Sequence, residues 1–180
     1  VFEGVPLPFD DWCEVVVSYG GSVELFTLYD VFDDFEQTAS YHARMLEMLR
    51  KVDERLITKA AAILQVRDVM AFTQEVETFV QNMLQHGVRC FAVPYIPNRD
   101  RWSVVVRLHR MLPPDISIHL LGVEHLADLY LAASFPRPFT VDSTLPLATA
   151  IARCRGEDVL WWKEKLTPEA VARVVNNCLL

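Results

Sequence analysis

Short apolar runs alternate along the chain with longer segments in which apolar residues recur every three or four positions. The runs predict buried strands and the periodic segments predict amphipathic helices. We expect strands within 23–29, 56–65, 89–96, 115–123 and 139–146. We expect a first helix capped by Asp10 or Asp11 and ended by Gly20 and Gly21, then helices at 36–55, 73–86, 99–112, 125–135, 147–155 and 167–177.

Strands that alternate with helices through short loops predict parallel βαβ units, and hence an α/β fold. A closed (β/α)₈ TIM-type barrel has eight strands and about 250 residues, whereas this chain has 180 residues. We therefore expect the later five or so units of such a barrel over 1–157, followed by a helical tail over 158–180. An open doubly wound sheet is the alternative, although no GxGxxG fingerprint follows any expected strand.

Composition narrows the class of protein. Apolar side chains make up 52% of the chain, but no apolar stretch approaches the ~20 residues that cross a bilayer, and no signal sequence is visible. The cysteines Cys13, Cys90, Cys154 and Cys178 are far apart, which favours reduced thiols in a cytoplasmic protein without a metal site or other cofactor. The first residue is Val1. The net charge of −7 argues against non-specific binding of nucleic acid.

Polar residues follow the expected strands, where α/β proteins bind their ligands. They are Asp30, Gln65, Tyr95, Asn98, His119, Gly122, Asp142 and Ser143. A purely structural role is open for some of them: Asp30 and Ser143 suit helix N-caps, and His119 suits a satisfied core histidine. Asp142 interrupts the apolar run of "FTVDSTLP", and an unpaired carboxylate there costs several kcal/mol, so we expect a partner to hold it.

These residues carry a resemblance. The stretch "SIHLLGVEHLADLYLAASFPRPFTVDSTLP" resembles the part of queuine and archaeosine tRNA-guanine transglycosylases in which "H-Y-L-M-G-V-G" precedes a helix and a strand "F-D-C-V-x-P-T-R". Upstream, "AAILQ" and "GVRCFAVPYI" are similar to that family's "G-I-V-Q-G-G" and "G-F-x-G-Y-A-I-G-G-L". The segment "VELFTLYDVFDDFEQTASYHARML" resembles the strand and acidic turn of phage and bacterial relatives that are proposed to act on DNA. The resemblance spans roughly residues 10 to 150.

The resemblance implies a (β/α)₈ barrel and a covalent mechanism. Asp142 occupies the position of the nucleophile, which attacks C1′ of a guanosine and holds a glycosyl ester until a 7-deazaguanine base replaces guanine. Asp30 and Gln65 match positions that hydrogen-bond the heterocycle, and Tyr95, His119 and Gly122 complete our set of base-binding candidates. The base must first leave its stack.

The chain also departs from the family pattern. Pro94 and Tyr95 replace a glycine pair that approaches the base, and Val66 and Arg67 replace the glycines after the glutamine. The zinc module of the tRNA enzymes is missing, which favours DNA over tRNA as the polymer. The family's early strands are also missing, so we expect a preceding segment or a partner chain to complete the barrel.

Several basic residues are candidates for phosphate contacts, namely Arg67, Arg99, Arg101, Arg153 and Arg155. Trp161 and Trp162 suit either a stacking platform for bases or an anchor for the last helix. Two rival functions remain open. One is a non-catalytic subunit that binds a partner chain or nucleic acid, and the other is an unrelated barrel enzyme, for which only Lys59 lies near a strand as a Schiff-base candidate.

Overall fold

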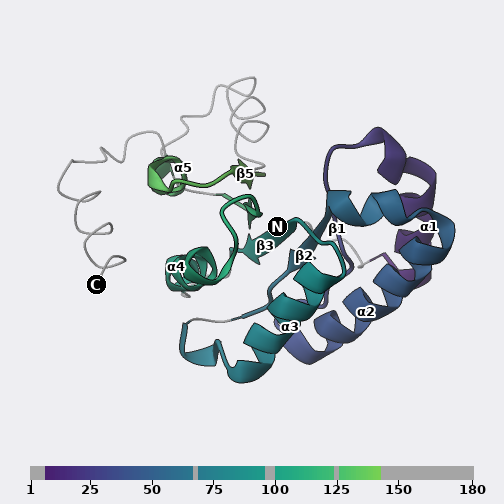
Figure 1. Cartoon of the computed structure of the whole chain (residues 1–180), viewed down its shortest axis with the longest axis horizontal. Coiled ribbons are helices and arrows are strands. Elements are labelled where there is room, and N and C mark those ends of the chain that lie inside the picture. The colour runs from purple at the N-terminus through teal and green to yellow at the C-terminus, as the bar shows by residue number, and fades with distance from the viewer. Residues whose placement is uncertain (1–6, 67–68, 96–99, 124–125, 143–180) are drawn as a thin grey trace, which may run out of the picture. The chain divides into compact units, whose positions relative to one another are not determined.

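The computed structural model describes residues 7–66, 69–95, 100–123 and 126–142. Helices and strands alternate through them (Figure 1). In chain order they are α1 (Phe9–Tyr19), β1 (Phe26–Thr27), α2 (Phe35–Val52), β2 (Ala60–Ile63), α3 (Gln74–Gln85), β3 (Cys90–Pro94), α4 (Arg101–Met111), β4 (Ser117–Leu121), α5 (Leu126–Ser134) and β5 (Phe139–Val141). Three short 3₁₀ helices lie between them: η1 (Gly20–Ser22), η2 (Glu54–Lys59) and η3 (Val69–Ala71).

The five strands form one sheet in the order β1-β2-β3-β4-β5. The resolved pairings are parallel, with Phe26 opposite Ala60, Ala61 opposite Cys90 and Ile118 opposite Phe139. The prediction of a parallel α/β fold is therefore confirmed. Each strand joins on the same side of the one before it, so the order contains no reversal of the kind that defines a doubly wound sheet.

Contacts divide the chain into two compact units, Val1–Ala92 and Val93–Leu180. In the first unit, every residue of β2 is buried, as are Leu46 and Leu49 of α2 and Val76 and Val80 of α3. A strand covered on both faces is apolar at every position, which is why "AAAI" carries no alternation. In the second unit, Ile118 and Leu120 of β4 and Val104 and Leu108 of α4 are fully buried.

Helix α1 contacts the outer edge of β1. The indole nitrogen of Trp12 donates a hydrogen bond to the carbonyl oxygen of Thr27, at 3.2 Å. The next residue, Leu28, donates its N–H to Ala61 of β2, so the Thr27 carbonyl points away from β2 because successive residues of a strand face opposite sides. At this position the outer edge of β1 is bonded by the indole of Trp12.

Several predicted boundaries are wrong. The strand expected over 56–65 begins only at Ala60, because 54–59 form η2, where the Asp53 side chain accepts a hydrogen bond from the Arg55 N–H. Leu56 and Ile57 are buried in this helix, so an apolar pattern does not distinguish it from a strand. Asp10 and Asp11 lie in the first turn of α1, after the cap position at Pro8. The helices expected at 147–155 and 167–177, the tail over 158–180, and Trp161 and Trp162 lie outside the described residues.

Within the described part of the chain, no helix combines the length and apolar character needed to cross a membrane.

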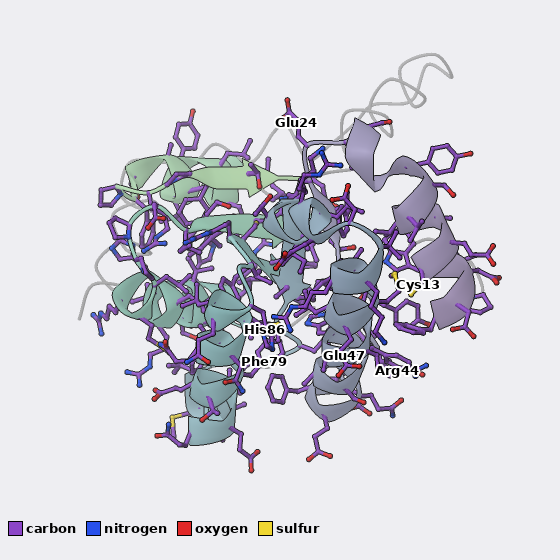
Figure 2. All side chains as sticks on the ribbon, turned by 45° about the vertical axis from the view of Figure 1, so that its right-hand side comes forward. Cys13, Glu24, Arg44, Glu47, Phe79 and His86 are labelled. Atoms are coloured by element: carbon purple, nitrogen blue, oxygen red, sulfur yellow. The ribbon has the colours of Figure 1, made fainter. Side chains whose placement is uncertain are left out.

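A histidine is buried without a partner in the core of the first unit. His42 of α2 has 0% of its surface exposed, and neither ring nitrogen has a hydrogen-bond partner among the described residues. The ring of Phe79, on α3, lies 5.6 Å from its own, and Figure 2 shows Phe79 between the two helices. Burial lowers the pKa of His42 from 6.5 to about 3, since a charged ring there would lack water and any counter-charge.

We expect His42 to make the protein less stable in acid. Its folded pKa lies below its unfolded pKa, so the unfolded state binds the extra proton between about pH 6.5 and 3, and stability is lost as the pH falls through that window. From pH 7.5 to 5.0 this one residue should lower the free energy of unfolding by about 2 kcal/mol. Urea unfolding of the wild type and of His42→Leu at both pH values measures the difference. An equal fall in the two proteins would contradict the assignment.

Candidate functional site

The carboxylate of Asp142 lies directly after β5 and is tied to the end of β4. Its Oδ1 accepts a hydrogen bond from the backbone N–H of Gly122. Its own N–H donates to the Leu120 carbonyl at 3.2 Å, and its carbonyl accepts from the Val123 N–H at 2.9 Å. The expectation that a partner holds this carboxylate is confirmed. Both Asp142 and Gly122 are exposed, so the carboxylate is oriented by protein and open to a ligand.

The pairing between β4 and β5 changes at this point. The Ile118 N–H donates to the carbonyl of Pro138, and the two-residue period of a parallel ladder would bring the Gly122 N–H to the carbonyl of Asp142. Val123 takes that carbonyl instead, and Gly122 bonds the side chain. Gly122 has φ of +65°, a conformation that favours glycine. The left-handed glycine thus ends the ladder and leaves one N–H for the carboxylate.

His119 lies beside this group. It pairs across the strands with Thr140, whose Oγ1 is 2.7 Å from the ring Nδ1. Burial lowers the pKa of His119, and the Asp142 carboxylate acts in the opposite direction. His119 is 8% exposed and neutral at neutral pH, since its pKa lies below the usual 6.5. The arrangement therefore fits the structural role considered for it, a buried and satisfied histidine.

A second polar group lies at the carboxyl end of β2, in the first unit. Gln65 is 4% exposed. Its Nε2 donates to Oδ2 of Asp30 at 2.5 Å, and its Oε1 accepts the N–H of Asp33 at 3.2 Å. Burial raises the pKa of Asp30, and the Gln65 hydrogen bond partly offsets this. Two of the predicted base-binding residues are therefore neighbours, with the amide of one oriented by the other.

The loop after Asp30 is braced locally. The N–H of Val31 donates to Thr38 Oγ1 at 2.9 Å, and the Thr38 hydroxyl lies 3.2 Å from the Val31 carbonyl. Asp33 has φ of +60°, and Asp34 caps α2 by accepting the Gln37 N–H. The N-cap of α2 is Asp34, so the alternative reading of Asp30 as that cap is wrong.

A shallow pocket of about 290 Å³ opens beside Gln65. Its lining includes four acidic residues, Asp33, Asp34, Glu36 and Glu75, and the apolar side chains of Phe35 and Val76. Its volume is at the lower end of small-molecule sites. Acceptor groups around an apolar floor suit a ligand that presents N–H donors.

The predicted phosphate contacts are not supported at the position that the structure describes. Arg101 is 6% exposed and forms a buried ion pair with Asp128, so it is not a surface cation. Its side chain is held inside by this ion pair and by a hydrogen bond from Nη1 to the Leu121 carbonyl, at the end of β4. Arg67, Arg99, Arg153 and Arg155 lie outside the described residues, as do Asn98 and Ser143.

Other sequence candidates are positioned as follows. Tyr95 directly follows β3 and gives its N–H to the Leu121 carbonyl at 2.9 Å. The Lys59 ammonium, at the amino end of β2, donates to the Gly21 carbonyl at 2.8 Å.

Cys90 is buried and Cys13 is half-buried near Arg44 (Figure 2). Among the described residues, no three His, Cys, Asp or Glu side chains are grouped to hold a metal ion.

Sequence reasoning missed Asp128, Trp102 and Thr140. Asp128 accepts from the Trp102 indole at 2.7 Å as well as from Arg101. A signal was present: Asp128 is the one acidic residue in the apolar helix "LADLYLAAS", and a carboxylate on such a helix requires partners. Thr140 lies two residues before Asp142, so in an extended chain their side chains project to the same side.

Compared with known proteins, the chain matches no protein-family model, and no curated protein is significantly similar to it.

Proposed function

We propose that the protein is a base-exchanging glycosyltransferase that replaces guanine in a nucleic acid, DNA rather than tRNA, by a 7-deazaguanine. The observation that carries the proposal is the Asp142 carboxylate, exposed at the carboxyl end of its strand and oriented by one backbone N–H. A carboxylate held in this way suits nucleophilic attack on a sugar carbon, because one oxygen is fixed by the Gly122 N–H and the second oxygen can form the new bond.

The reaction has two steps. In the first, a carboxylate oxygen of Asp142 bonds to C1′, the C1′–N9 bond breaks, and guanine keeps the electron pair and takes up a proton. In the second, the ring nitrogen of the incoming base loses its proton and bonds to C1′ as the bond between C1′ and the Asp142 oxygen breaks. The electron pair of that bond returns to the Asp142 carboxylate. Two substitutions of this kind have lower barriers than one direct exchange.

The wider architecture supports the proposal. We assign the sheet to a segment of a (β/α)₈ barrel, because parallel strands that follow one another in chain order are what a barrel requires. We assign recognition of the heterocycle to Asp30 and Gln65. The N1 and N2 hydrogens of guanine match a carboxylate acceptor, and its O6 matches the second N–H of the amide.

The test is incorporation of label. The purified protein is incubated with duplex DNA or with tRNA, together with labelled guanine or a labelled 7-deazaguanine, and label in the polymer is counted. We expect label in DNA only. Label in tRNA would show that the substrate is RNA. No label in either polymer would contradict the proposed enzymatic function.

One observation favours a non-catalytic subunit as the second candidate. Tyr95 replaces a glycine of the family pattern, and its N–H is bonded to Leu121, so that group does not reach a base. Under this alternative the protein forms a stable complex with a catalytic chain. A monodisperse monomer in size-exclusion chromatography with light scattering would count against it.

A further inference from the structure

One peptide unit, Leu121–Gly122, connects the Asp142 carboxylate to a buried arginine within the second unit. Its N–H end donates to Asp142 Oδ1. Its carbonyl end accepts two hydrogen bonds, from Arg101 Nη1 at 3.0 Å and from the Tyr95 N–H at 2.9 Å. The same peptide group therefore receives a cation at one end and presents a donor to an anion at the other.

The guanidinium of Arg101 is fixed in place. Its Nη2 bonds Oδ2 of Asp128, whose Oδ1 accepts from the Trp102 indole. The ring of Tyr95 lies with its centroid 5.5 Å from the guanidinium carbon. Arg101 and Asp128 are each 6% exposed, so water screens the field of this pair little at the neighbouring carbonyl.

We propose that Arg101 is a positioning residue for Asp142, acting through the Leu121–Gly122 peptide. A guanidinium on the carbonyl oxygen polarises the peptide and makes the Gly122 N–H a stronger donor, an effect of about 10–30% for each bond in such a chain. The stronger bond fixes Oδ1 and leaves Oδ2 to react. The catalytic use of this contact rests on the proposed function, but its effect on the Gly122 hydrogen bond does not.

The test is nuclear magnetic resonance on the whole protein labelled with ¹⁵N-glycine. The chain has 6 glycines, so the spectrum is simple, and the Gly122 signal is the one displaced in Asp142→Asn. In the double variant Arg101→Gln, Asp128→Asn, which removes both buried charges together, we expect the Gly122 amide proton to move upfield. We also expect it to exchange with solvent about tenfold faster.

Asp128→Asn alone is the matched control, because it removes the ion pair while leaving Arg101 able to bond Leu121. Its Gly122 exchange rate should stay within about threefold of the wild type. An unchanged Gly122 signal in the double variant overturns the proposal, and so does an equal change in the control. If the double variant does not fold, Arg101→Met, Asp128→Leu replaces it, because an apolar pair removes the cation from the Leu121 carbonyl and leaves no unpaired buried charge. An unchanged signal there also overturns the proposal.

Activity provides a second readout. A positioning role predicts that the turnover number falls in the double variant while KM is retained, because substrate binding does not use Arg101. If the wild type exchanges no base but the Gly122 signal responds as expected, the proposed function fails and the structural contact stands. If exchange occurs and the Gly122 signal does not respond, only the role of Arg101 fails.

Discussion

Asp142→Asn should lower base exchange by about 10⁴-fold or more, because a carboxamide is a poor nucleophile and forms no glycosyl ester. The substitution is nearly isosteric. The amide oxygen can still accept the Gly122 N–H that bonds Oδ1 in the wild type, so we expect the far-ultraviolet circular dichroism and the thermal midpoint to be retained. Initial rates of label incorporation into DNA measure the effect.

The matched control is Asp115→Asn. Asp115 is an exposed aspartate that precedes β4, at the opposite end of the strand from Gly122, and its exchange rate should match the wild type. The covalent intermediate offers an independent check: the wild type, but not Asp142→Asn, should form a protein–DNA species that survives denaturing electrophoresis. Exchange retained in Asp142→Asn would eliminate Asp142 as the nucleophile.

Arg137→Met should destabilise the second unit by about 3 kcal/mol. The guanidinium of Arg137 makes five hydrogen bonds, to the carbonyls of His109, Leu112, Pro113 and Ile116 and to Nδ1 of His109. Two of these carbonyls lie at the end of α4, where the helix supplies no donors of its own. Losing the arginine leaves buried acceptors unpaired, at roughly 1 kcal/mol or more each.

Hydrogen–deuterium exchange of the peptide covering 101–121 at increasing urea concentration reports this loss. Arg137→Lys should lose about 2 kcal/mol, because an ammonium replaces at most three of the five bonds. Arg110→Met is the control, since Arg110 is exposed in the last turn of the same helix and should change stability by less than about 0.5 kcal/mol. Equal stability of Arg137→Met and Arg110→Met would show that the five bonds contribute nothing.

The periodicity of the sequence determined the order of the elements. The runs containing "AAAI", "CFAVP" and "SIHLL" became β2, β3 and β4, because a strand buried on both faces is mostly apolar. His119 in the last of these runs is buried and has Thr140 as its partner. The same reasoning located Asp142 and Gln65 at strand ends, since a polar residue that interrupts such a run needs a partner or a ligand. The spacing of apolar residues indicates which positions are buried, and the predicted strands and their polar ends were both inferred from burial.

Only the tertiary structure decided which groups bond to one another. The sequence predicts a phosphate contact for Arg101. The residue is buried instead, because Asp128, 27 positions away, supplies its counter-charge. Asp30 reads as a helix cap, yet its partner is Gln65, 35 positions away. A side chain's partner across such distances depends on how parallel strands bring loops together, and no local pattern of apolar and polar residues carries that information. The sequence by itself thus determined which segments are strands and where their polar ends lie, whereas the fold decided what each polar end can do.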